Sequence, residues 1–105
     1  MQKVLEIGGL PDAGLAASAA FYREFLEDAE ALLAEADTDA LAILLPAAGP
    51  DHDDWRQTLA RDLARAHTPK RVNVVGADED GVKSDLLAYL RDAPGVTGQY
   101  LAGHE

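Results

Sequence analysis

The chain has 105 residues, which is enough for one domain, and its 19 acidic against 9 basic residues give a net charge of −10. This charge repels a phosphate backbone and an anionic bilayer, so neither nucleic acid nor a membrane is an expected partner. Cysteine is absent, no apolar run approaches a membrane span and Met1–Leu10 lacks the pattern of a signal peptide, which excludes disulfides and thiolate sites and predicts a cytoplasmic location.

The first half of the chain predicts a strand, a long helix and a second strand. Lys3–Ile7 is short, partly β-branched and followed by Gly8-Gly9, which indicates a strand that ends in a turn. Apolar side chains then recur at steps of three and four from about Leu15 to Ala36, the spacing of one helical face. Ala40–Pro46 is continuously apolar, as expected of a parallel strand that is covered on both faces.

The second half repeats this alternation of helix and strand. Trp55, Leu59 and Leu63 are four residues apart and share one face of a helix. Acidic residues gather near its start and basic residues near its end, which complements the helix dipole. The predicted elements are a helix over about Asp51–His67, a strand over Arg71–Gly76, a helix over about Gly81–Arg91 with Val82, Leu86, Leu87 and Leu90 inward, and a short strand over Gln99–Ala102.

The order β-α-β-α-β-α-β predicts an α/β fold, with one domain over residues 1–105 and a small open parallel sheet of four strands joined by three crossover helices. Right-handed crossovers with the strand order 1-2-3-4 would place all three helices on one face. The apolar strand Ala40–Pro46, however, indicates cover on both faces. We therefore expect either a strand order that doubles back, as in 2-1-3-4, or a partner that covers the open face.

Three segments of the second half have a specific order. Leu59–Ala64 (LARDLA) ends one helix, Arg71–Val75 (RVNVV) follows it, and Thr97–Leu101 (TGQYL) comes just after the helix that ends at Leu86–Leu90. In this order they resemble the C-terminal half of short-chain dehydrogenases/reductases, in which an R-V-N-x-V strand follows the catalytic helix and a T-G-Q strand closes the fold. The resemblance covers about Leu59–Gly103 and implies a Rossmann-like fold.

The matching positions lack the residues that the family uses for its reaction. That family binds a dinucleotide with a T-G-x-x-x-G-[IL]-G loop, and the glycines after the first predicted strand match neither this loop nor a P-loop. None of the three tyrosines has a lysine four residues on, and Ala40–Pro46, the counterpart of the family's serine-bearing strand, contains no serine. We therefore expect no catalytic residue and no cofactor.

A small ligand has one candidate site, at the carboxyl edge of the sheet where open α/β folds bind ligands. The candidate residues there are Gly8, Gly9, Gly49, Gly76, Asp78 and Asp80. Gly8-Gly9 could form a backbone nest for an anion, and the acids after the third strand could hold a cation or a polar ligand. Ordinary turns and a helix cap are the favoured interpretation of both.

A metal site is a weaker candidate. Asp51–Asp54 (DHDD) offers carboxylates and an imidazole, but adjacent residues at a helix start point in different directions. Acids that stabilise the helix N-terminus are the favoured interpretation. The histidines have no metal-ligand spacing, so we expect no metal.

The leading function hypothesis is a non-catalytic protein that acts by protein–protein association. The resemblance implies pairing through two long helices, and the candidate interface residues on their counterparts are Phe21, Phe25, Trp55 and Leu59, although a core position is favoured for Trp55. The expected partner is a second copy or an intact dehydrogenase. The alternatives are a small-ligand binding module at the carboxyl edge and an enzyme of unrelated chemistry.

Overall fold

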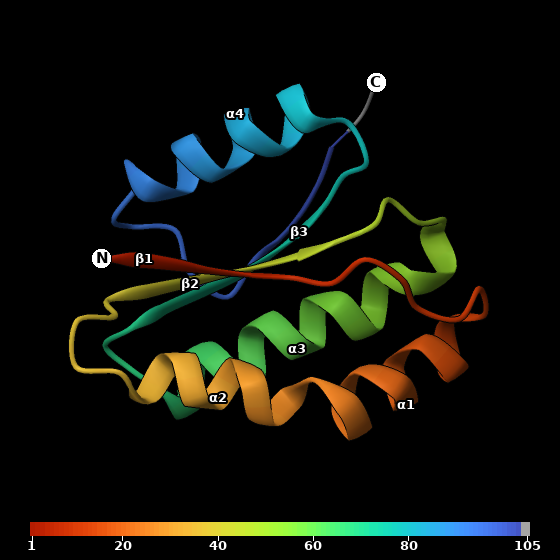
Figure 1. The fold of residues 1–105 in the computed structure, drawn as a ribbon, viewed down its shortest axis with the longest axis horizontal. Helices are drawn as coiled ribbons and strands as arrows, with labels where there is room; N and C mark the ends of the chain where they lie inside the picture. Colours follow the sequence, from red (N-terminus) through yellow and green to blue (C-terminus); the bar gives the residue numbers. More distant parts are fainter. Residues whose placement is uncertain (104–105) are drawn as a thin grey trace.

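The computed structural model describes residues 1–103, which form one parallel sheet with helices on both sides (Figure 1). The elements in chain order are β1 (Gln2–Glu6), α1 (Gly14–Glu24), α2 (Leu26–Ala34), β2 (Ala40–Leu45), η1 (Pro50–His52, a 3₁₀ turn), α3 (Asp53–Ala66), β3 (Arg71–Gly76), α4 (Asp80–Arg91) and β4 (Tyr100–Ala102). The strands pair in the order β1-β2-β3-β4. The predicted α/β class and small four-stranded parallel sheet are confirmed.

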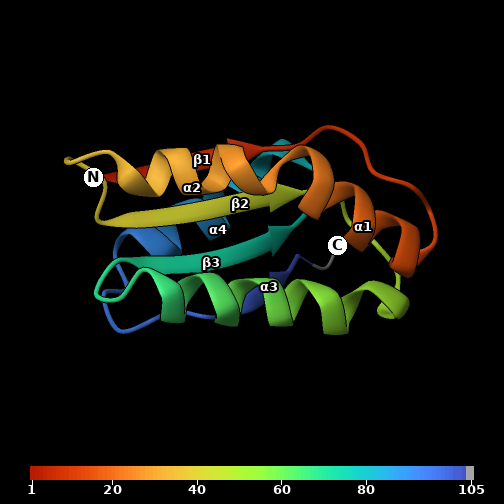
Figure 2. The same ribbon diagram turned by 90° about the horizontal axis from the view of Figure 1, so that it is seen from below.

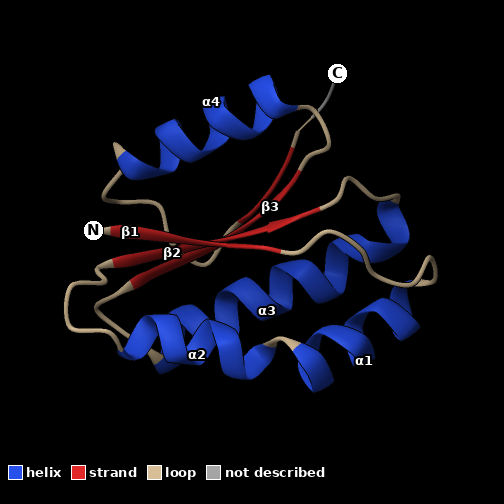
Figure 3. Ribbon diagram, viewed as in Figure 1, coloured by secondary structure: helices blue, strands red, loops and turns tan. Residues whose placement is uncertain are grey.

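The single long helix predicted over Leu15–Ala36 is wrong, because the helix breaks at Phe25. Phe25 has φ −125° and ψ −12°, outside the usual helical region. The break lies between the two blue segments α1 and α2 in Figure 3. It allows α1 to pack on η1 and α3 while α2 packs on β1 and β2. No helix within residues 1–103 is long and apolar enough to cross a membrane.

Helices cover both faces of the sheet although the strands follow one another in simple order. α1, α2 and α3 lie on one face and α4 on the other (Figures 1 and 2). The first two crossovers are right-handed, whereas β3-α4-β4 advances in the same direction across the opposite face and is left-handed, the uncommon hand. Neither predicted solution, a doubled-back strand order or a partner on the bare face, is needed to cover the sheet.

The residues of β2 are apolar throughout because they meet helices on both sides, as predicted. Its six residues are all buried. Leu41, Ile43 and Leu45 belong to the core beneath α1–α3, whereas Ala42 and Leu44 belong to the core beneath α4, since successive side chains of a strand point to opposite faces. The inward residues predicted for α4 pack against this second core.

Candidate functional site

Hydrogen bonds at the amino end of β4 join the segments that carry the family resemblance. Asn73 is 2% exposed. Its Nδ2 donates to Val96 O (3.0 Å), and its Oδ1 accepts from Gln99 N (3.1 Å). Thr97 Oγ1 accepts a bond from Val72 N (3.0 Å). These bonds hold β4 against β3, so the residues of this Asn73 junction (Val72, Asn73, Thr97 and Gln99) build the fold.

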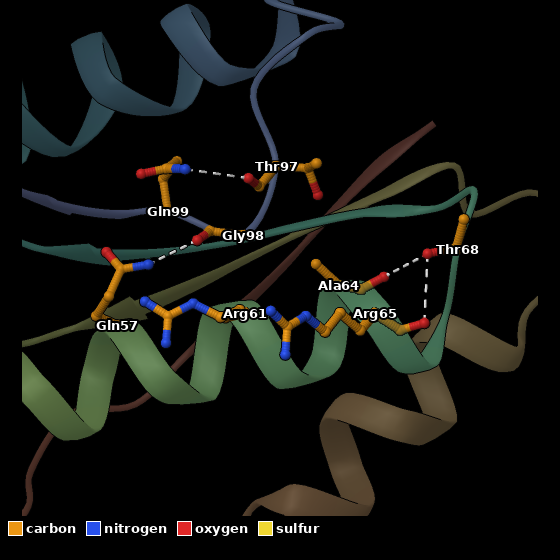
Figure 4. A pocket seen from close by; sticks show the side chains of 8 residues that line it. All are labelled: Gln57, Arg61, Ala64, Arg65, Thr68, Thr97, Gly98 and Gln99. Carbon is orange, nitrogen blue, oxygen red and sulfur yellow. Dashed lines mark hydrogen bonds between the residues drawn. The ribbon is translucent and has the colours of Figure 1, made fainter.

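A shallow groove of about 470 Å³ lies beside the Asn73 junction, between α3 and the segment that leads into β4 (Figure 4). Gln57 Nε2 donates to Gly98 O (2.7 Å), and its Oε1 accepts from Tyr100 N (3.2 Å). This side chain therefore occupies the outer edge of β4 as a neighbouring strand would. Arg61 and Arg65 line the groove from α3, both exposed and with no ion pair among residues 1–103.

The carboxyl edge of the sheet holds a second hollow of about 250 Å³. We call it the edge cavity; its lining is the loop after β1 (Leu10–Asp12), the loop after β2 (Pro46–Gly49), Asp51, His52 and Arg56. It lies where loops from two neighbouring strands meet the start of α3. This is the region in which the sequence predicted a ligand edge.

The structure brings some of the predicted edge residues to hollows and leaves others apart. Gly49 lines the edge cavity, and Gly8 and Asp78 line a smaller hollow of about 100 Å³ beside it. Asp78 Oδ1 also accepts a bond (2.9 Å) from a backbone N–H of the loop after β2, so this acid orders the edge. Gly9 and Asp80 line neither hollow, and the Asp80 side chain is fully exposed.

Arg56 is the principal charged group of the edge cavity, and the sequence analysis missed it. It is 1% exposed. Its Nη1 donates to Pro46 O (2.8 Å) and Tyr100 Oη (3.1 Å), and its Cζ lies 5.5 Å from the ring centroids of both Trp55 and Tyr100. A Cβ on Gly76 would lie 2.9 Å from Nη1 and 2.6 Å from Tyr100 Oη. The predicted edge residue Gly76 therefore makes room for this pair.

The guanidinium of Arg56 keeps unused hydrogen-bond donors. Within residues 1–103, Nε is enclosed without a partner, Nη2 makes no hydrogen bond and no carboxylate forms an ion pair with the group. A buried cation normally has a carboxylate partner because loss of water costs several kcal/mol. The two aromatic rings and two oxygen acceptors offset part of this cost.

His52 supports the edge cavity through a fixed hydrogen-bond chain. It is 5% exposed, its Nε2 lies 2.8 Å from Asp12 O, and Trp55 Nε1 donates to its Nδ1 (3.1 Å). Nδ1 therefore accepts a hydrogen bond, and Nε2 faces a carbonyl oxygen to which it can donate. Asp53 and Asp54 lie in the first turn of α3, as the dipole argument predicted. No cluster able to hold a metal ion is found among residues 1–103.

The predicted interface residues divide between core and surface. Phe21 and Leu59 are 0% and 1% exposed and belong to the chain's own core, so they have no surface to offer a partner. Phe25 and Trp55 are partly exposed. Of the predicted set, therefore, Phe25 and Trp55 remain available for contact.

The sequence analysis missed two more exposed apolar residues on α1. Leu15 is 87% exposed and Tyr22 is 39% exposed, and their spacing of seven places them on one helical face. A groove of about 390 Å³ separates α1 from α3 here, lined by Ser18, Tyr22, Asp54, Trp55 and Thr58. Burial raises the pKa of Tyr22 above its usual value, and the nearby charge of Asp62 raises it further.

Comparison with known proteins identifies a family to which the chain is similar. A family model described as SDR-like, short chain dehydrogenase-like protein, matches residues 5–103. No curated protein and no solved structure shows a match to the chain. The family match thus extends the resemblance seen over Leu59–Gly103 across the first half of the chain.

Proposed function

We propose that this chain, which belongs to the short chain dehydrogenase-like family, is a non-catalytic member that acts by association through the outer surface of α1 and α3. A second copy of the chain is the first partner we expect. The tyrosine–lysine spacing and glycine-rich loop of the family's enzymes do not occur in this sequence. The helices corresponding to those through which the resemblance implied pairing are kept, although the first is broken at Phe25.

The observation that carries this proposal is the groove between α1 and α3, which the rings of Tyr22 and Trp55 line. We call the α1/α3 surface the region formed by Leu15 and the groove residues Ser18, Tyr22, Asp54, Trp55 and Thr58. Half-exposed aromatic rings in a groove are the side chains that most often anchor protein interfaces. A stable dimer buries roughly 800 Å² per partner, a modest share of the chain's 5652 Å².

The cover on both sheet faces limits what the partner has to do. The sequence analysis considered a partner that covers a bare sheet, and the chain's own helices now fill that role. Association is therefore proposed only for the helical surface. An intact dehydrogenase of the same family remains the alternative partner.

Sedimentation velocity across micromolar concentrations tests the proposal, with Leu15→Lys as the disrupting variant. Leu15 is 87% exposed, so lysine costs the folded monomer little, but a charge in an apolar contact should weaken the dimer at least ~10-fold. Tyr89→Lys is the matched control, because Tyr89 is 53% exposed on α4, on the opposite side of the sheet. A wild-type chain that stays monomeric, alone and mixed with an intact family dehydrogenase, refutes the proposal.

The ionisation of Tyr22 gives an independent readout of the same surface. Its folded-state pKa is raised, chiefly by burial, so its contribution to folding is complete below the ordinary tyrosine pKa of about 10 and is lost as pH rises through the folded value. Further burial in a dimer would raise the pKa again. We expect the dimer to dissociate as pH rises above about 10, and Tyr22→Phe to reduce this pH dependence. Equal pH dependence in both proteins would exclude Tyr22 from the interface.

A second candidate function is the binding of a small ligand at the carboxyl edge. The specific observation that favours it is Arg56, a buried cation with unused donors in the lining of the edge cavity. This candidate is compatible with association, because the linings of the edge cavity and of the groove between α1 and α3 share no residue, although Trp55 of the groove contacts Arg56 and His52 of the cavity. A thermal-shift screen with small metabolites tests it, and the absence of any hit would contradict it.

A further inference from the structure

We propose that the edge cavity binds a small monocarboxylate through the guanidinium of Arg56. This inference rests on the second candidate function above and adds the chemical class of the ligand. It is independent of association through the α1/α3 surface.

Arg56 places a buried positive charge in the lining of the edge cavity. Arg56 carries a positive charge, as guanidinium groups do in proteins. It is 1% exposed, and no carboxylate of residues 1–103 pairs with it. An anion in the cavity would supply the missing opposite charge, in a site where charge-assisted hydrogen bonds are strong because water is largely excluded.

The guanidinium of Arg56 keeps hydrogen-bond donors that no described residue accepts. Nη1 already donates to Pro46 O and Tyr100 Oη, whereas Nε and Nη2 have no partner among the described residues. Nε is enclosed by protein atoms, so the N–H groups of Nη2 are the donors that remain for a ligand, and a charged N–H donor makes a strong hydrogen bond to a carboxylate oxygen. The bonds of Nη1 and the two aromatic rings fix the orientation of the guanidinium before a ligand arrives.

The size of the edge cavity limits the ligand to a small molecule. Its volume of about 250 Å³ lies just below the roughly 300–1,000 Å³ of pockets that hold drug-sized ligands. A dinucleotide would not fit, whereas an acid of a few carbon atoms would. The loops that line the cavity contribute Leu10, Pro11, Ala47 and Ala48, which suit a short apolar chain attached to the carboxylate.

The acidic residues of the edge cavity favour a ligand with a single negative charge. Asp12 and Asp51 also line the cavity, and the Asp51 side chain is 63% exposed at its rim. These acids repel an anion, and both their repulsion and the attraction of Arg56 are about twice as large for a phosphate dianion as for a carboxylate. The cost of removing water from the ligand is greater for the dianion and opposes its binding in this largely enclosed site. With one guanidinium against two rim acids, a monocarboxylate is the favoured occupant.

A titration with sodium propionate, followed by ¹H–¹⁵N NMR in a carboxylate-free buffer of constant ionic strength, tests the inference. The Arg56 Nε–Hε signal reports a change at the guanidinium that binds the ligand. The Trp55 indole signal reports it through His52, because Trp55 Nε1 donates to a ring that lines the cavity. Propionamide serves as the neutral probe of the same shape, and inorganic phosphate as the dianion.

We expect saturable shifts of both signals with propionate and at least ~10-fold weaker binding of propionamide and phosphate. Arg56→Lys keeps the charge but loses the planar guanidinium that places Nη2 at the cavity, so it should weaken propionate binding at least ~10-fold. Arg65→Lys, on the exposed side of the same helix, is the matched control and should leave binding unchanged. Asp51→Asn keeps an oxygen that can accept the Gly14 N–H bond but removes the charge, so propionate should bind a few-fold tighter.

The possible failures differ from one another. Equal binding of propionate and propionamide would overturn the carboxylate inference and leave a ligand site at the edge intact. Tighter binding of phosphate would overturn the choice of a single charge. No saturable shift with any probe would overturn the inference, and with no hit in the thermal-shift screen it would also overturn the second candidate function. If Arg56→Lys does not fold, Asp51→Asn decides: unchanged affinity in that variant would contradict the proposed electrostatics.

Discussion

The two ends of the β3–β4 pair use polar side chains in opposite ways. At the Asn73 junction, the buried amide of Asn73 donates to one backbone oxygen and accepts from one backbone N–H, and Thr97 satisfies a third backbone group. At the carboxyl end, Arg56 is buried just as deeply but is left with donors that no group in residues 1–103 accepts.

This difference separates the part of the chain that makes the fold from the part that can bind. Buried polar groups are costly unless they are paired, so a fully paired junction serves stability. An unpaired buried donor lowers stability and is retained at a site that has another use for it. The Asn73 junction therefore explains the fold, whereas the binding that we propose depends on Arg56, which lies outside the Leu59–Gly103 resemblance.

Asn73→Ala is the change we expect to have the largest effect. It leaves Val96 O and Gln99 N without partners beside β4, which should reduce the free energy of unfolding by about 2–4 kcal/mol. Urea denaturation measures this loss. Gln99→Ala is the control, because the Gln99 side chain makes only a long exposed bond (3.4 Å) and should cost under about 0.5 kcal/mol. A loss for Asn73→Ala as small as that of the control would contradict the structural role of the junction.

Gly76→Ala should disturb the Arg56–Tyr100 pair at the carboxyl end of the β3–β4 pair. The new methyl group would lie 2.6 Å from Tyr100 Oη and 2.9 Å from Arg56 Nη1, so the pair must shift. We expect a loss of about 1–3 kcal/mol in unfolding free energy and the loss of propionate binding.

Gly81→Ala is the control for this substitution. No atom lies within 4 Å of a Cβ at that position in the first turn of α4, so alanine should be neutral or stabilise by up to about 1 kcal/mol. Unchanged propionate affinity in Gly76→Ala, measured on protein that folds like the control, would show that the position of Arg56 does not matter for binding.

Tyr100→Phe should have the smallest effect on stability, and it tests how much the hydroxyl of Tyr100 contributes to holding Arg56. It removes one acceptor from Arg56 and keeps the ring beneath the guanidinium, so we expect a loss of about 0.5–1.5 kcal/mol. Propionate should bind at least as well, because one more donor becomes free. Binding reduced more than ~10-fold would instead show that the hydroxyl itself contacts the ligand, as observed by the same NMR titration.

The helices and strands that follow from a local sequence pattern could be predicted from the sequence. β2 was predicted by its apolar run and α3 by the spacing of its apolar residues and the charges at its ends, and the strand predicted over Arg71–Gly76 is β3. The break at Phe25 was not predictable, because the apolar spacing continues across it and only contacts with separate neighbours distinguish α1 from α2. The left-handed β3-α4-β4 crossover was missed because the usual handedness rule argues against it.

The candidate site was predictable in place but not in chemistry. The carboxyl edge follows from the parallel sheet, and Gly49 and Asp78 do lie at its hollows. Arg56 was overlooked although a signal was present: it falls three, four and seven residues before the buried Leu59, Ala60 and Leu63. A charged residue within the apolar stripe of a helix indicates a buried charge. Its acceptors, Pro46 O and Tyr100 Oη, come from distant parts of the chain and required the fold.

The measurement that tests the contrast between the two ends most directly is one ¹H–¹⁵N NMR titration with propionate that follows both ends at once. The account predicts saturable shifts at the Arg56 Nε–Hε, the Trp55 indole and the amides of the loop after β2, with the amides of Gly98 and Gln99 unchanged. Shifts confined to Gly98 and Gln99, or equal at both ends, would contradict the account and place binding in the groove beside the Asn73 junction.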